Sequence, residues 1–213
     1  MVVWLNHLNK EKIREVSKLH KVLLSDSPIP KLGKDFMNGF YYSQLIKKEL
    51  IHCLTFIEQN KVIGFIVITK YPGNFMLKGI QKSPFSLFIR LIEAILRNPK
   101  RLLLIFNMIF LALARKTSSL PSGTSELLSI GVLKEYRNNV DSKSGLRVSH
   151  ALFTGAVEYL KKEKQKIFQV LTDKTNNEAI KFYKSMNMEL TQSEFYDINH
   201  QVLFFMRLNN KII

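Results

Sequence analysis

Two β-rich runs on either side of Asn60 constrain the fold of this chain more than any other feature of its sequence. The first run, "IHCLTFIEQ", begins at Ile51, and the second, "KVIGFIVITKY", ends at Tyr71. Both are rich in Ile, Val, Phe and Thr, which favour strands, and a single turn residue separates them. We therefore predict an antiparallel hairpin and, around it, a sheet that is largely antiparallel.

The composition excludes several classes of protein. Of the 213 residues, 46% are hydrophobic and 23% are charged, so the chain can bury a sizeable core and is not a disordered protein. The single cysteine, Cys53, excludes an internal disulfide framework and a cysteine-rich metal site. The five histidines include no pair at metal-ligand spacing, so we predict no metal. Because "MVVWLNHLNKEK" soon becomes polar, it is not typical of a signal peptide, and we expect a cytoplasmic protein.

The N-terminal segments predict a strand and two helices before the hairpin. Residues 2–5 are typical of a short strand. Asn9 can cap a helix over 10–24, where apolar residues recur at helical spacing. Residues 25–33 contain two prolines and predict a loop, whereas the apolar residues of 34–48 predict a second helix.

The C-terminal half predicts further strands alternating with helices. The apolar positions of 148–160 fall on one helical face, and 176–186 predicts a shorter amphipathic helix. We predict strands at 125–133, 166–172, 193–198 and 201–208, the last two as an antiparallel pair. The strand–helix–strand passage can form one parallel pair. The expected fold is therefore mixed α/β, a single domain over 1–213 with a mostly antiparallel central sheet flanked by helices.

Residues 73–120 interrupt this alternation, and we predict a helical insertion between the third and fourth strands. Two helical stretches, 84–98 and 99–116, each open with a proline suited to a first helical turn. The apolar run inside the insertion is too short to span a bilayer, which takes about 20 residues.

The insertion is also strongly basic. Eight Lys and Arg side chains and one Glu lie within 73–120, so this segment contributes +7 to the net charge of +15. Its role stays open between packing over the core, a homodimer interface, and contact with an anionic membrane surface. Nucleic-acid binding is disfavoured because the basic residues mix with apolar ones.

A polar loop joins the strand at 125–133 to the helix that begins near Val148. Such a junction presents free backbone N–H groups and the positive end of a helix dipole, and a phosphate group suits both. Arg137, Lys143 and Arg147 add positive charge within eleven residues. This pattern is common in proteins, so by itself it is weak support for phosphate binding.

The segment "NNEAIKFYKSMNM", residues 176–188, places Asn176, Ala179 and Tyr183 in the pattern N-x-x-A-x-x-x-Y. With the strand ending "SIGVLKEYR" and the polar loop that opens a helix, this ordered set resembles the GCN5-related N-acetyltransferase (GNAT) superfamily over roughly residues 124–188. The family then has glycine and phenylalanine where this chain has Asn187 and Met188. Asparagine is the best non-glycine residue for the left-handed position after a helix.

The loop departs from the family pattern. The family has arginine or glutamine, two residues, a glycine, one residue, and then a glycine or alanine. Here several extra residues separate Arg137 from Gly145, and the best match places Arg147 and Ser149 at the glycine positions. This exchange keeps the backbone donors but adds a bulky side chain.

The resemblance implies an acetyl-CoA-dependent N-acetyltransferase. The co-substrate would lie in a wedge between the strands at 125–133 and 166–172, which are expected to separate after Ile130. The residues implied in binding it are Ile130, Gly131, Val132, Arg137, Gly145, Leu146, Arg147, Val148, Ser149, Asn176, Ala179 and Phe182. Of these, the backbone groups of Ile130 and Val132 would pair with the pantetheine arm, and residues 145–149 would hold the pyrophosphate.

The resemblance also implies the chemistry. A primary amine of the acceptor would attack the thioester directly, in a ternary complex. A backbone N–H near Val132 would stabilise the oxyanion, and Tyr183 would protonate the departing thiolate as the general acid. Glu126 is the acidic residue best placed to help the amine lose its proton.

The acceptor is an unidentified small-molecule amine. The net charge of +15 disfavours cationic acceptors such as polyamines, and it favours an anionic amine such as an amino sugar linked to a nucleotide or lipid carrier. The alternative is a non-catalytic module of the same fold that binds a membrane surface or a protein partner through 73–120. In that case the protein would be peripheral to the membrane.

Overall fold

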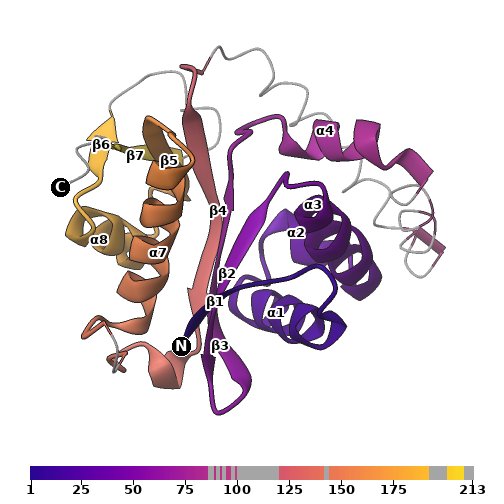
Figure 1. Ribbon diagram of the computed structural model, residues 1–213, viewed down its shortest axis with the longest axis horizontal. Coiled ribbons are helices and arrows are strands. Elements are labelled where there is room, and N and C mark those ends of the chain that lie inside the picture. The colour runs from indigo at the N-terminus through magenta and orange to yellow at the C-terminus, as the bar shows by residue number, and fades with distance from the viewer. Residues whose placement is uncertain are drawn as a thin grey trace.

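A computed structural model describes residues 1–85, 89, 92, 95, 96, 99, 120–141, 144–191 and 201–208. These residues form a seven-stranded sheet in the order β1-β2-β3-β4-β5-β7-β6. Figure 1 shows the sheet between two layers of helices, with α7 and α8 on one side and α1, α2 and α3 on the other.

The strands are β1 (Val2–Trp4), β2 (His52–Glu58), β3 (Lys61–Thr69), β4 (Thr124–Val132), β5 (Ile167–Asp173), β6 (Glu189–Thr191) and β7 (Gln201–Arg207). The α-helices are α1 (Lys10–Leu23), α2 (Pro28–Lys31), α3 (Leu45–Lys47), α4 (Phe75–Lys82), α7 (Val148–Lys162) and α8 (Asn177–Ser185). A π-helix, η1 (Phe36–Gln44), and a 3₁₀ turn, η2 (Lys134–Tyr136), complete the described elements.

The predicted hairpin is confirmed as β2 and β3. The two strands pair antiparallel up to Glu58↔Lys61, and Gln59 and Asn60 make the turn with φ of 46° and 61°. The predicted parallel pair is confirmed as β4 and β5, whereas every other described ladder is antiparallel. The sheet is therefore mixed and mostly antiparallel.

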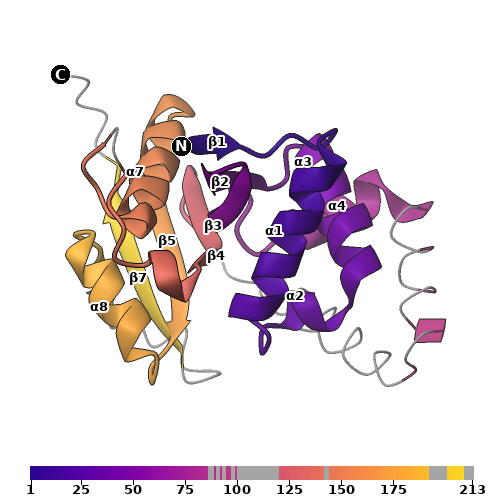
Figure 2. The ribbon, with the colours of Figure 1, turned by 90° about the horizontal axis from the view of Figure 1, so that it is seen from below.

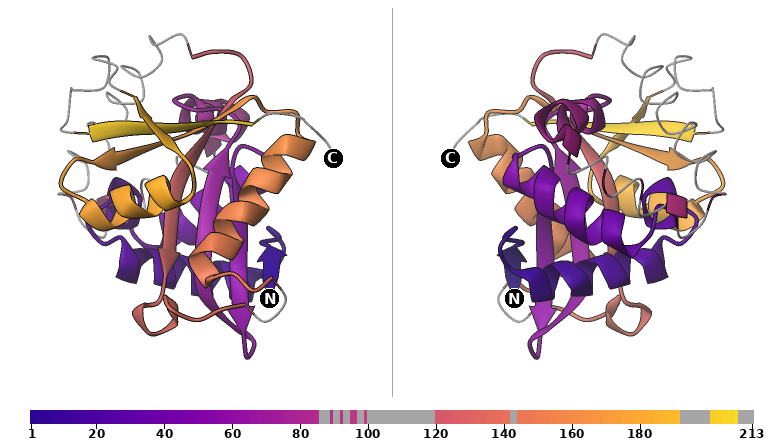
Figure 3. Two further views of the ribbon diagram at one scale, coloured as in Figure 1. Left: turned by 90° about the vertical axis from the view of Figure 1, so that its left-hand side faces the viewer. Right: turned by 90° about the vertical axis from the view of Figure 1, so that its right-hand side faces the viewer.

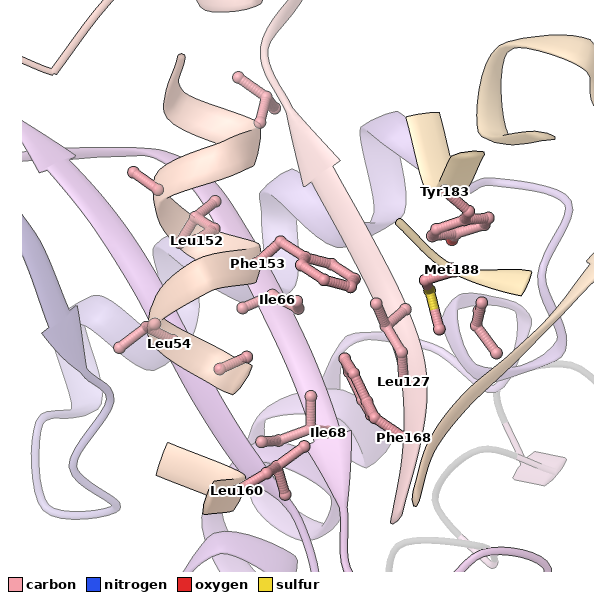
Figure 4. Close-up of a cluster of buried hydrophobic side chains, with 14 of the residues drawn as sticks. Leu54, Ile66, Ile68, Leu127, Leu152, Phe153, Leu160, Phe168, Tyr183 and Met188 are labelled. Carbon is pink, nitrogen blue, oxygen red and sulfur yellow. The ribbon is translucent and has the colours of Figure 1, made fainter. Parts of the chain in front are cut away.

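The sheet separates two hydrophobic clusters, because successive side chains of a strand point to opposite faces. On the face covered by α1, called the α1 face, Phe65 and Val67 of β3 join residues of α1 and η1. On the opposite face, called the α7 face, Ile66 and Ile68 pack against α7 and α8. Figure 4 shows the side chains of α7, including Leu152, over this second set of strand residues.

The helix predicted over 34–48 is mostly a π-helix, which corrects the expected α-helix. Phe40, Tyr41 and Tyr42 are consecutive, yet all three are at most 1% exposed. The wider turn of a π-helix lets more consecutive side chains face the core than an α-helix does, and π-turns occur frequently at functional sites. The predicted loop at 25–33 contains one short helix, α2, which begins at Pro28.

The structure describes only part of the predicted insertion. α4 lies before the two predicted helices, and its Phe75, Met76 and Ile80 pack against the α1-face cluster. Most of 84–98 and 99–116 lies outside the described residues, as does the strand predicted at 193–198. Among the described residues, β6 pairs with β7 at the sheet edge, and this strand was not predicted. Within the described ranges, no helix has the length and hydropathy needed to cross a membrane.

Candidate active site

β4 and β5 lie side by side for only part of their length. Their parallel pairing runs from Thr124↔Ile167 to Leu127↔Val170 and ends there. Beyond this point β4 continues to Val132 against β3, and β5 continues to Asp173 against β7. The two strands therefore separate after Leu127, three residues earlier than the separation expected after Ile130.

A β-bulge at Leu128 explains where the strands separate. Leu127 pairs with Ile68 of β3 and Ser129 pairs with the adjacent Val67, so Leu128 is an extra residue on β4. A bulge bends its strand and increases the local twist. Figure 3 shows β7, the partner of β5, running across the direction of β3 and β4. The bulge thus turns β4 away from β5 and opens a wedge between them.

Within this wedge, the β4 edge beyond Leu127 keeps backbone groups with no strand beside them among the described residues. The N–H of Leu133 donates to the carbonyl of Ile63, so the backbone groups of Leu133 face β3. Because these groups alternate along a strand, those of Ile130 and Val132 point the other way, into the wedge. The Val132 carbonyl accepts a hydrogen bond of 3.4 Å from Nε of Arg137, which agrees with this orientation.

The first turn of α7 supplies further backbone donors. The helix begins at Val148, and Arg147 precedes it without a side-chain cap. The N–H of Val148 donates to the carbonyl of Asn139 at 3.1 Å. Those of Ser149 and His150 have no intrahelical partner, because the first residues of any helix lack one. Of these two donors, sequence reasoning identified Ser149 and missed His150.

The preceding loop uses several of its own donors. Asp141 is buried, and its Oδ2 accepts from the N–H of Ser144 at 3.1 Å and from the Ser144 hydroxyl at 2.8 Å. The N–H of Gly145 donates to the Asp141 carbonyl at 2.9 Å, and that of Leu146 to Ser144 Oγ at 3.4 Å. The amides of Gly145 and Leu146, both predicted to hold pyrophosphate, are thus engaged inside the loop. The donors facing outward are those of the α7 first turn.

Arg137 connects the end of β4 to the start of α8. Besides its bond to the Val132 carbonyl, its Nη1 lies 3.3 Å from Oε2 of Glu178. Both side chains are well exposed, at 50% and 85%. Exposed ion pairs stabilise a protein weakly, so this contact can exchange for another anion at small cost.

The local structure of α8 fixes the position of Tyr183. Oδ1 of Asn176 accepts from the N–H of Ala179 at 3.1 Å, which caps the helix. Asn187 follows the helix with a φ of 58°, so the predicted left-handed asparagine is confirmed. Half-buried Ala179 and Phe182 pack against the α7-face cluster.

Tyr183 is buried on the α7 face. Its side chain is 4% exposed, and its ring centroid lies 5.7 Å from that of Phe204 in β7. Figure 4 shows the ring next to Met188, and both residues belong to the same hydrophobic cluster as Phe153. Burial raises the pKa of the Tyr183 phenol above its ordinary value, so the group keeps its proton over the whole neutral range.

Glu126 lies on the opposite face of β4. It pairs across the sheet with Thr69 and Gln169, and it is only 4% exposed, so it is not a solvated strand end. Burial raises the pKa of Tyr41 in η1, and Cys53 and the Glu126 charge add to this increase, which places Glu126 close to η1. The two predicted catalytic side chains therefore lie on opposite faces of the sheet.

Ser129 is a polar residue at the wedge that sequence reasoning missed. It pairs with Val67, whose side chain belongs to the α1 face, so the Ser129 side chain lies on the α1 face with Glu126. Its hydroxyl is buried, and it has no hydrogen-bond partner within the described ranges. A buried hydroxyl without a partner costs stability, so it is a candidate ligand contact. The signal was invisible in the sequence because it depends on the bulge.

Gly131 lies on the α1 face as well, where α1 approaches β4 closely. A Cβ atom placed at Gly131 would lie 2.9 Å from Cδ1 of Leu23 and 3.2 Å from Cε1 of Phe65. Glycine is therefore required for this contact. Gly131 was among the residues predicted to bind the co-substrate. The structure places it against Leu23 of α1, whereas the backbone groups of its neighbours, Ile130 and Val132, point into the wedge.

Comparison with known proteins gave matches among solved structures alone. No family model matches the sequence, and no curated protein matches it. The PaiA N-acetyltransferase of Thermoplasma acidophilum, solved in complex with coenzyme A, is 10% identical, with a TM-score of 0.54 over 97% of this chain and 99% of that one. An acetyltransferase of the GNAT family from Staphylococcus aureus Mu50 is 11% identical, with a TM-score of 0.55 over 98% and 99%. NAA60 of Arabidopsis thaliana, solved with a bisubstrate analogue, is 15% identical, with a TM-score of 0.55 over 97% and 98%.

Proposed function

Because this chain has the fold of the GNAT N-acetyltransferases, we propose that it transfers an acetyl group from acetyl-CoA to a primary amine. The observation that carries the proposal is the wedge between β4 and β5. There the open edge of β4 lies beyond Leu127, and the uncapped first turn of α7 follows in the chain. Neither feature serves the packing of the sheet, whereas both offer unpaired backbone donors to a ligand.

The residues around the wedge fit the chemical groups of coenzyme A. Its arm contains amide groups, and an open strand edge can pair with such groups as it pairs with an added strand. The β4 groups that would do so are those of Ile130 and the carbonyl of Val132, since the Val132 N–H is assigned to the reacting oxygen. The pyrophosphate fits the N–H groups of Ser149 and His150 at the positive end of α7. Arg147 and Arg137 would add charge-assisted contacts.

Bound acetyl-CoA would supply the acetyl group as a thioester: the amine nitrogen forms the new amide bond while the C–S bond breaks, and the sulfur leaves as a thiol. Tyr183 holds a proton that its raised pKa retains at neutral pH, and it would donate that proton on the α7 face. The N–H of Val132 would stabilise negative charge on the reacting oxygen.

The α1 face would handle the acceptor. Glu126 would accept the proton that the amine loses, and the Ser129 hydroxyl would accept a hydrogen bond from the amine and orient it. This assignment gives the unpaired Ser129 Oγ a partner. It also places proton acceptance and proton donation on opposite faces of β4, which suits direct transfer between two molecules bound together.

Thermal melting with coenzyme A tests the binding step. Saturation at one hundred times the dissociation constant should raise the free energy of unfolding by about 2.7 kcal/mol. Arg147→Gln should weaken binding, whereas Arg14→Gln, an equal charge change on the exposed side of α1, should not. Thiol release from acetyl-CoA in the presence of a panel of primary amines tests the transfer step. Binding without thiol release above the hydrolysis rate for every amine would contradict an acetyltransferase.

A further inference from the structure

A second candidate binding site lies outside the wedge, where α1, α2 and η1 meet. It is a hollow of about 350 Å³ whose described lining includes Lys21, Lys31, Lys34, Gly33 and Asp35. Lys21 comes from α1, Lys31 from α2, and Lys34 precedes η1. The end of α1, the end of α2 and the turn before η1 therefore each bring one lysine to the hollow.

The three lysines of this hollow are exposed and unpaired. Among the described residues, none of them forms a salt bridge, and Asp35 is already engaged in an interaction of its own. Like charges that converge raise the local positive potential and concentrate anions there. An anion in the hollow would offset this repulsion.

The backbone around the hollow is well ordered by local contacts. Gly33 adopts a φ of 100°, and its N–H donates to the Pro30 carbonyl at 3.1 Å. The Gly33 carbonyl accepts from the N–H of Met37 at 3.1 Å, and Leu32 is 2% exposed in the core. Lys31 and Lys34 thus project from a backbone fixed by local hydrogen bonds, and Lys21 projects from α1, so little backbone entropy is lost when they hold a ligand.

The last turn of α1 contributes both to the hollow, through Lys21, and to the contact with the open part of β4, through Leu23. Leu23 ends α1 two residues after Lys21, and it touches Gly131 in the open part of β4. Gly131 shares the α1 face with Ser129 and Glu126. Figure 2 shows α1 and α2 together on the side of β4 away from α7.

From these observations we propose that the hollow binds a phosphate group of the acceptor, which is then a phosphate-bearing primary amine. The inference rests on the proposed function for its link to acetyl transfer. Lysine acts on phosphate as a point charge, whereas planar carboxylates are preferred partners of arginine forks, and no arginine is among the described residues of the lining. The shared chemistry is a phosphate ester, either in a small soluble amine or in a lipid headgroup.

A titration with inorganic phosphate tests the site. Binding is monitored by NMR through the backbone amide resonance of Gly33 in ¹⁵N-labelled protein. We expect a saturable shift that weakens as ionic strength rises. The triple variant Lys21→Gln/Lys31→Gln/Lys34→Gln should weaken phosphate binding at least about tenfold, because it removes three charge-assisted contacts. The matched control, Lys161→Gln/Lys162→Gln/Lys164→Gln near the end of α7, changes the net charge equally and should shift the affinity less than about twofold.

The same spectra separate this inference from the proposed function. Coenzyme A should shift the amide of Ser149 whether or not the hollow binds phosphate. Two results would overturn the inference: no saturable shift of the Gly33 amide with phosphate, or an equal loss of phosphate affinity in both triple variants. If coenzyme A still shifts the Ser149 amide, the acetyltransferase proposal remains.

Two further ligands identify the source of the phosphate. O-phosphoethanolamine represents a soluble acceptor, and vesicles containing phosphatidylethanolamine, compared with phosphatidylcholine alone, represent a lipid. The source of the phosphate is indicated by the ligand that shifts the Gly33 amide resonance in the wild type but not in the Lys21→Gln/Lys31→Gln/Lys34→Gln variant. Failure of both, despite phosphate binding, would overturn the role of the hollow in acceptor binding.

Discussion

Two serines of β4 provide a paired test of the site, because the same substitution should change stability in opposite directions. The hydroxyl of Ser125 is buried and donates to the carbonyl of Ile167 at 2.8 Å. The hydroxyl of Ser129, four residues along the same strand, is buried without a hydrogen-bond partner in the described structure. Ser→Ala deletes one oxygen atom in each case.

The magnitudes result from this difference. Ser125→Ala removes a net hydrogen bond, which should lower the free energy of unfolding by about 0.5–1.5 kcal/mol. Ser129→Ala removes a hydroxyl whose unpaired burial costs about 1–3 kcal/mol, so it should raise the free energy of unfolding by about 1 kcal/mol. The two variants should therefore differ by about 1.5 kcal/mol or more.

Urea unfolding of both variants, monitored by circular dichroism, measures this difference in the free energy of unfolding. The kinetics of acetyl transfer to a reactive amine measure the effect of each substitution on function. Ser129→Ala should raise KM for the amine and leave the affinity for coenzyme A unchanged, whereas Ser125→Ala should change neither beyond its effect on folding. Equal destabilisation by the two substitutions would refute the reasoning, because it would mean that Ser129 has a structural partner.

Three other outcomes are expected. Tyr183→Phe keeps the buried ring but removes the proton donor, so transfer should fall by about 10²–10⁴-fold with unchanged coenzyme A affinity; an undiminished rate of thiol release would exclude Tyr183 as the acid. Glu178→Gln releases Arg137 from an exposed ion pair worth at most about 1 kcal/mol, so calorimetry should find coenzyme A binding up to about fivefold tighter, and weaker binding would argue against that exchange. Burial lowers the pKa of His20 to about 4 from 6.5, so its contribution to stability is complete above pH 6.5. As the pH falls from 6.5 toward 4, the free energy of unfolding should drop by about 3 kcal/mol through this histidine. Urea midpoints that stay constant across this pH range would contradict the prediction.

Much of the frame depends on local sequence signals. The hairpin around Asn60, the cap at Asn9 and the left-handed Asn187 depend on residues near in sequence, and the structure has each of them as predicted. The strand–helix–strand passage was also predictable, because hydrophobic periodicity is itself local.

The remaining features depend on contacts between distant segments. The bulge at Leu128 exists only in the register of β4 against β3, so the sequence alone misplaced the opening of the wedge by three residues. The π-helix is tied to the burial of Tyr41 and Tyr42 together, with His20 Nδ1 lying 2.6 Å from the Tyr42 hydroxyl. The lysine hollow needs the end of α1 to lie against α2 and the turn before η1, and no spacing in the sequence predicts that packing.

The central claim is that the open edge of β4 and the first turn of α7 hold coenzyme A. Amide hydrogen exchange measured residue by residue, with and without saturating coenzyme A, tests it most directly. The account predicts slower exchange at Ile130, Val132, Ser149 and His150, with little change in the β2–β3 hairpin. Unchanged exchange at these four amides, in a protein shown to bind coenzyme A, would contradict it.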